Sequence, residues 1–167
     1  MLQRSAATNT QIVVVRLTNS FGVPTSPRPE TWNLLMHDLC RQVVTLRSLV
    51  LRSGPRICRD AMALCDVVEV LAQFVASPQS LQGGCLLASG ETMRLAQLAA
   101  LFQRHAEDVL AISAEVKAPH RQSTVPTTYT LNTRRLSDAG IRIPNNRNQE
   151  LCDLLHYAQR EFGQGRS

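Results

Sequence analysis

Two pairs of side chains that could bind a metal ion stand far apart in the 167-residue sequence. His37 precedes Cys40 by three residues and Cys152 precedes His156 by four, so on helices each pair would project from one face. If those helices were neighbours, the four side chains could form the tetrahedral Cys2His2 set that zinc prefers. Neither spacing matches a zinc-finger motif, and free cysteine commonly serves as a small buried apolar residue. We therefore expect no metal ion.

A further histidine, His105, falls on the apolar face of a predicted helix. A catalytic or metal-binding role would need an acidic or cysteine side chain aimed at it from another helix. The alternative is a buried histidine that hydrogen-bonds a backbone carbonyl or a side chain. We expect this alternative, with a pH-dependent stability as its consequence.

Motifs that mark common enzymes are absent from the sequence. It contains no Walker loop, no GxSxG, no HExxH and no GxGxxG dinucleotide fingerprint. The adjacent acids Glu107 and Asp108 diverge around a helix, and Asp66 with Glu69 suits a solvated face. We therefore predict a non-enzymatic protein with no catalytic residues and no cofactor.

The strongest charge pattern lies between residues 117 and 147. This stretch holds six of the 18 lysine and arginine residues and a single acid, Asp138, in a chain of net charge +5. It is rich in Pro, Thr and Asn and has no helical hydrophobic period, which indicates a loop. Arginine binds phosphate bidentately and an aromatic ring can stack on a base, although such a loop could also be a solvated linker paired with acidic helices. The residues predicted to bind nucleic acid are Arg121, Arg134, Arg135, Arg142, Arg147 and Tyr129.

Hydrophobic periodicity predicts the elements around this loop. Apolar residues recur three and four residues apart, as in the helices of a bundle. The predicted helices span 32–50, 57–75, 95–116 and, from a cap at 145–146, the stretch to residue 162. Short connections between helices favour antiparallel packing of sequence neighbours.

The N-terminal part is predicted to be extended. Residues 11–17 form a β-branched run typical of a strand, and the prolines of 24–29 form a stiff linker. We therefore expect an all-α fold: a four-helix bundle with a short N-terminal strand or extended arm and a long basic loop between helices three and four. Residues 1–29 would be the arm and linker, and 30–167 a single helical-bundle domain.

No stretch of the sequence resembles a targeting or membrane segment, because the apolar runs are shorter than the roughly 20 residues that span a bilayer. The five cysteines form no CxxC pair, which favours reduced thiols. We expect a cytoplasmic or nuclear protein in a reducing compartment, or a virion protein if it is viral.

Residues 126–139 run from Pro-Thr-Thr into Thr-Arg-Arg-Leu-Ser-Asp-Ala. This stretch resembles a segment of tobamovirus-like rod-shaped virus coat proteins. The resemblance implies a four-helix bundle whose loop faces RNA, with Arg134 and Arg135 on phosphate and Asp138 at contacts between subunits or with RNA.

These observations lead to a functional hypothesis and a rival. The first is a structural protein of the viral coat or nucleocapsid kind, which binds RNA backbone through the arginine-rich loop and assembles into an oligomer or filament. The rival is an all-helical adaptor, or a viral accessory or effector protein, that binds a host protein through an anchor such as Trp32 or Phe74.

Overall fold

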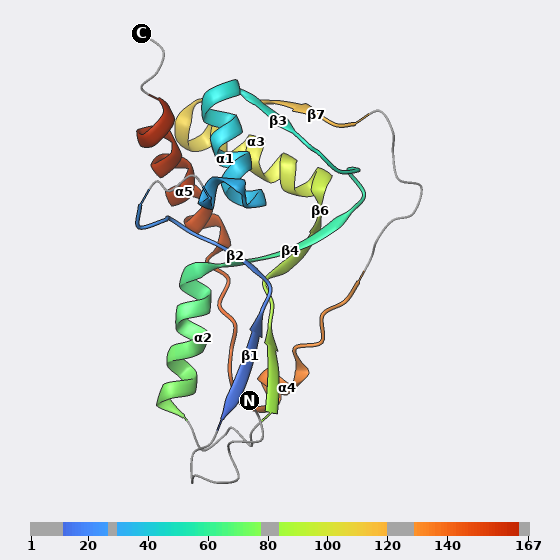
Figure 1. Ribbon diagram of the computed structural model, residues 1–167, viewed down its shortest axis with the longest axis vertical. Helices are drawn as coiled ribbons and strands as arrows, with labels where there is room; N and C mark the ends of the chain where they lie inside the picture. The colour runs from blue at the N-terminus through green and yellow to red at the C-terminus, as the bar shows by residue number, and fades with distance from the viewer. Residues whose placement is uncertain (1–11, 27–29, 78–83, 120–128, 164–167) are drawn as a thin grey trace.

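The computed structural model describes residues 12–26, 30–77, 84–119 and 129–163 and has a mixed α/β fold (Figure 1). Strands and helices alternate along the chain, and three of the strand pairs are parallel. The predicted all-α four-helix bundle is therefore wrong. We call the two halves of the view in Figure 1 the upper region, which contains α1, α3 and α5, and the lower region, which contains α2, β1, β5 and α4.

Three long helices dominate the upper region: α1 (Leu35–Leu46), α3 (Leu95–Leu110) and α5 (Arg147–Phe162). Helix α5 packs against both α1 and α3, and a 3-10 turn, η2 (Thr31–Asn33), precedes α1. Five apolar positions of α5 were predicted to be buried. Leu151, Leu154, Leu155 and Ala158 lie in the core, whereas Phe162 is only partly buried against it.

Short strands cross the upper region beside these helices. The strands β2 (Asn19–Phe21), β4 (Cys58–Ala63) and β6 (Glu91–Arg94) form one sheet, with β4 in the middle. A second, parallel pair joins β3 (Ser48–Val50) to β7 (Glu115–Lys117). These pairs connect segments that lie far apart in the sequence.

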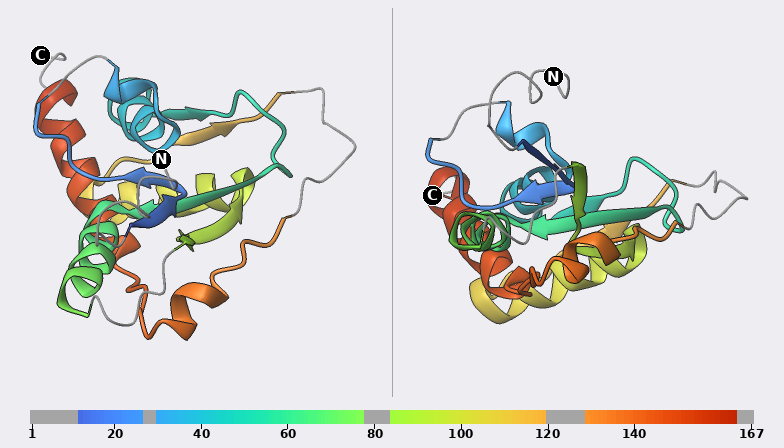
Figure 2. Two further views of the ribbon diagram at one scale, coloured as in Figure 1. Left: turned by 60° about the horizontal axis from the view of Figure 1, so that its bottom comes forward. Right: turned by 90° about the horizontal axis from the view of Figure 1, so that it is seen from below.

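The lower region is built on two parallel strands, β1 (Val13–Leu17) and β5 (Gly84–Ala88). Helix α2 (Leu64–Ala76) covers one face of this pair, and the short helix α4 (Arg134–Asp138) lies beyond β5 (Figure 2). The strand predicted within 11–17 is confirmed over residues 13–17, and residue 11 lies outside the described part of the chain. The sequence did not identify its partner strand, because β5 lies in a stretch without a clear secondary-structure pattern.

The predicted helices were too long because their boundaries carry unusual signals. Helices α1 and α3 end at Arg47 and Ala111, which adopt left-handed backbone conformations with φ of 50° and 53°. Glycine normally marks such an end, and neither position has one. The first part of the predicted helix over 57–75 is the strand β4. This strand lies between two others and is largely buried, so it lacks the alternating pattern that marks a half-exposed strand.

The structure bears on two further predictions from the sequence. Residues 129–139 of the coat-protein-like stretch form an extended segment and α4, and residues 126–128 lie outside the described part of the chain. The four-helix bundle that the resemblance implied is absent. Among the described helices, none is both long and apolar enough to cross a membrane.

Candidate functional site

A groove in the upper region is formed by two cavities that share Leu35 and Arg59. The larger, of about 380 Å³, begins directly after the carboxyl end of β1 and runs past β2 to the first turn of α1. The smaller, of about 190 Å³, extends from Arg59 toward β3 and the start of α3. Arg59 lines both cavities, so this residue lies where the two adjoin.

The first turn of α1 lines the larger cavity. Leu34, which precedes the helix, offers no side-chain cap, and the first helical backbone hydrogen bond runs from the amide of Asp38 to the carbonyl of Leu34. The preceding amides of this turn are donors that the helix itself cannot satisfy. The helix dipole adds partial positive charge at the same end, so this end of the groove favours an anion.

Arg59 supplies a full positive charge at this anion-favouring end. Its side chain is half-buried and donates a hydrogen bond from Nη1 to the carbonyl of Cys58 at 2.9 Å. The neighbouring carboxylate, Asp60, is buried and accepts bonds from the Gly90 amide and the Thr92 hydroxyl, at 2.9 and 2.8 Å. Within the described residues no carboxylate pairs with Arg59, so its charge is available to a ligand.

A polar network holds the far rim of the groove. The buried Asp38 pairs with Arg41 at 2.8 Å and with Arg52 at 3.4 Å, and it accepts a bond from Gln42. Gln42 in turn accepts a bond from the amide of Val50 at 2.6 Å, which ties β3 to α1. The groove therefore combines a fixed polar rim with the apolar side chains of Leu39 and Leu95.

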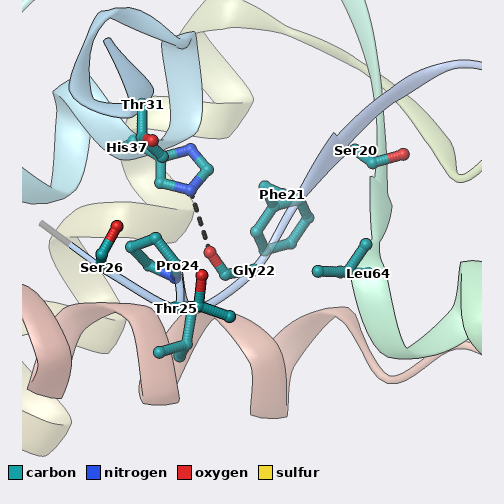
Figure 3. Close-up of a pocket in the computed structure, with 10 residues that line it drawn as sticks. Ser20, Phe21, Gly22, Pro24, Thr25, Ser26, Thr31, His37 and Leu64 are labelled. Carbon is teal, nitrogen blue, oxygen red and sulfur yellow. Dashed lines mark hydrogen bonds between the residues drawn. The ribbon is translucent and has the colours of Figure 1, made fainter. Parts of the chain in front are cut away.

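His37 lies between this groove and a second hollow, of about 420 Å³, that is drawn in Figure 3. Its Nε2 atom donates to the carbonyl of Gly22 at 2.9 Å, while Nδ1 is buried with no partner among the described residues. Burial lowers the pKa of His37, and the bond to Gly22 acts in the opposite direction. The neutral ring therefore joins α1 to the segment after β2. Gly22 is required there because a side chain would collide with Glu150 and Leu64.

The arginines predicted to bind nucleic acid lie outside the groove. Arg134 is exposed and pairs with Asp138 at 3.7 Å, and the backbone of Arg142 bonds to the side chain of Gln73. Arg147 pairs with Glu91 beside a separate cavity. Arg135 and Tyr129 are exposed, and Arg121 lies outside the described residues. Their binding of phosphate stays a prediction.

The cysteines and histidines of the two candidate metal-binding pairs do not come together. His105 is half-buried, and its Nδ1 lies 3.6 Å from the Sγ of Cys152, while Cys40 is fully buried. His156 is exposed and His37 contacts Gly22. Among the described residues no cluster of three or more histidine, cysteine or acidic side chains could hold a metal ion. These four side chains therefore do not form the Cys2His2 set that their spacing would allow.

The groove residues were missed because Arg59 lay inside a predicted helix and Asn19 lay in the predicted N-terminal arm, just after its strand. One signal was present: the charged pair of Arg59 and Asp60 interrupts an otherwise apolar run, and a charge in a buried strand needs a structural or functional partner. Trp32 and Phe74, considered as anchors for a protein partner, are both buried. They do not form an exposed docking surface.

No protein-family model and no curated protein matches the chain. Solved structures do share its fold. RMD from Pseudomonas aeruginosa, complexed with NADPH, matches with a TM-score of 0.72 and 15% identity over 96% of this chain and 52% of its own. UDP-N-acetylglucosamine 4-epimerase from Methanobrevibacter ruminantium M1, in complex with UDP-N-acetylmuramic acid, matches with a TM-score of 0.69 and 15% identity, covering 96% and 50%. UDP-glucuronic acid 4-epimerase from Bacillus cereus, in complex with NAD, matches with a TM-score of 0.70 and 13% identity, covering 98% and 48%.

These likenesses establish the fold. The chain spans about half the length of the solved chains it matches. The prediction of a non-enzymatic coat subunit that binds RNA is wrong, because it required a helical bundle, and the solved chains of the observed fold include two sugar-nucleotide epimerases. The rival prediction of an all-helical adaptor fails with the same bundle.

Proposed function

We propose that this chain binds a nucleoside diphosphate sugar and forms the substrate-binding half of an NAD(P)-linked sugar-nucleotide epimerase or dehydratase. The observation that carries the proposal is the convergence of Arg59 and the uncapped first turn of α1 on one groove. A diphosphate carries the negative charge that both groups favour. The names of the similar solved structures support the same ligand class.

The groove also has room for the two groups that flank a diphosphate. The nucleoside is assigned to the smaller cavity, where Leu39 and Leu95 offer apolar surface within the polar rim. The sugar is assigned to the larger cavity, beside the amide of Asn19 and the hydroxyl of Ser20. Ligands of parallel sheets collect at the carboxyl ends of strands, and this cavity adjoins that end of β1.

The residues of this chain do not fit a dinucleotide cofactor. The sequence contains no GxGxxG between a strand and a helix, so it lacks the close backbone approach that a pyrophosphate of NAD(P) requires. NAD(P) is assigned to the half of the solved structures that this chain does not match. The chemistry assigned to this chain is therefore to bind and orient the sugar nucleotide.

Calorimetric titration with UDP-N-acetylglucosamine and UDP-glucuronic acid tests the proposal. We expect Arg59→Ala to weaken binding by about 10- to 100-fold, because a hydrogen bond to a charged group contributes about 1.5–3 kcal/mol. Arg104→Ala removes the same charge from an exposed position on α3 and is the matched control. Free N-acetylglucosamine, which lacks the diphosphate, is expected not to bind. Equal losses in the two variants, or no binding of either nucleotide sugar at millimolar concentration, would contradict the proposal.

A further inference from the structure

The sheet of the lower region is too small to be complete. Parallel sheets are normally buried on both faces, and a two-stranded sheet is marginal by itself. Here β1 and β5 carry α2 on one face and α4 beyond β5, while the other face and the outer side of β1 are uncovered by the described elements (Figure 2). The surface around β1 is therefore where further sheet could be added.

The side chains of β1 fit this position in a larger sheet. Val13 and Val15 pack against the buried cluster under α2, whereas Val14 points to the opposite face and is 39% exposed. A strand with valine on both faces is typical of the interior of a parallel sheet and not of its edge. Among the described residues β1 pairs with β5 and with no other strand, so its second row of backbone groups is free.

Helix α2 carries an apolar stripe that no described element covers. The stripe residues are Leu64, Val68, Leu71 and Val75. Val68, Leu71 and Val75 each come one residue after a buried position of α2. One residue corresponds to about 100° of rotation, so the stripe lies about 100° round the helix from its buried face. Helix α2 runs antiparallel to β1 (Figure 1), so the stripe borders the helix face that packs toward β1 along the length of this strand. Val68 and Val75 are 60% and 82% exposed.

We propose that the free edge of β1 and the α2 stripe form one docking face for a parallel α/β half, which adds a strand beside β1 and a helix beside α2. The solved structures indicate what this face would bind. Nearly all of this chain matches about half of each of them. The other half of such a fold must attach where a parallel sheet can continue, and this face offers both an unpaired strand and an apolar helix side. The proposal rests on the fold likeness and not on the proposed ligand.

The test uses the whole 167-residue chain and the unmatched halves of RMD and of the two epimerases as probes, each first shown to bind its dinucleotide. We expect a 1:1 complex with at least one probe by light scattering and calorimetry. Val68→Glu combined with Val75→Glu is expected to weaken this complex by at least 10-fold. Leu46→Glu, an equally drastic change at an exposed leucine of α1, is the control and should leave it unchanged.

Hydrogen exchange of the chain alone gives a measurement that needs no probe. In β1, alternate amides point away from β5, and we expect these to exchange rapidly in the monomer and to become protected in the complex. No complex with any probe, a complex indifferent to the α2 variants, protection of every β1 amide in the monomer, or a homodimer that pairs this face with itself would overturn the proposal. Failure of docking would leave the Arg59-dependent titration with nucleotide sugars unaffected, so the two proposals can fail separately.

Discussion

The upper and lower regions of this protein differ in how completely each encloses its apolar residues. Among the described residues, the cluster centred on α1, α3 and α5 contains 23 buried residues, whereas the cluster beneath α2 contains eight. The lower region also exposes apolar side chains on both α2 and β1. The upper region therefore has the larger core, and the lower region has the smaller core together with the apolar stripe of α2 that the proposed docking face uses.

We expect the largest difference between the two regions when one buried phenylalanine in each is replaced by alanine and the loss of stability is compared. Phe102 is fully buried in α3, and Phe102→Ala should lower the free energy of unfolding by about 3–5 kcal/mol through lost burial and a cavity. Phe74→Ala in α2 should cost less than Phe102→Ala, because Phe74 is less completely buried and lies in the smaller cluster, which can collapse further around the gap. Urea unfolding of both variants provides the measurement. Equal losses would show that the lower region is as tightly packed as the upper.

The next effect tests the connection between the regions. Asp66 of α2 is buried and accepts bonds from the backbone and side-chain amides of Asn146, at 3.2 and 2.7 Å, just before α5. Asp66→Ala should cost about 1.5–3 kcal/mol, because it removes hydrogen bonds to a buried carboxylate. Asp108→Ala, at an exposed site on α3, is the control and should change stability by less than about 0.5 kcal/mol. A small effect of Asp66→Ala in urea unfolding would mean that apolar packing alone joins the regions.

A smaller, pH-dependent effect is expected from His37 in the upper region. Burial places the folded-state pKa of this ring below its unfolded value of 6.5, so a proton binds the unfolded chain more readily. The resulting stability is complete above about pH 6.5 and is lost as the pH falls through the folded-state pKa, by at most about 1.4 kcal/mol per pH unit. Unfolding measured from pH 7.5 to 5 should show this decline. His37→Gln should flatten it, whereas the exposed His156→Gln should not. An unchanged slope in His37→Gln would assign the pH dependence to other groups.

The smallest effect is expected in α4 of the lower region. Arg134 and Asp138 form an ion pair whose side chains are 82% and 67% exposed. Such a pair is screened by water and salt, so Arg134→Ala should change the free energy of unfolding by less than about 0.5 kcal/mol. Thermal melting at low and high salt checks this expectation. A loss above 1 kcal/mol would show that α4 contributes more to the lower region than its exposed position indicates.

Some elements could be predicted from the pattern of their own residues. The β-branched run at β1 predicted a strand, and the spacing of Leu151, Leu154 and Ala158 predicted the buried face of α5. The absence of GxGxxG also follows from the sequence alone.

Only the tertiary structure decided the pairing of the strands and therefore the site. Ser48 of β3 lies beside Glu115 of β7, and Val13 of β1 beside Gly84 of β5, across separations that no local period records. The left-handed ends of α1 and α3 could not be predicted from the sequence either, since neither position carries the glycine that normally marks such an end. Arg59 became a candidate ligand-binding residue when β4 placed it opposite the first turn of α1, because a groove is made by surfaces that meet in space and not by residues adjacent in the chain.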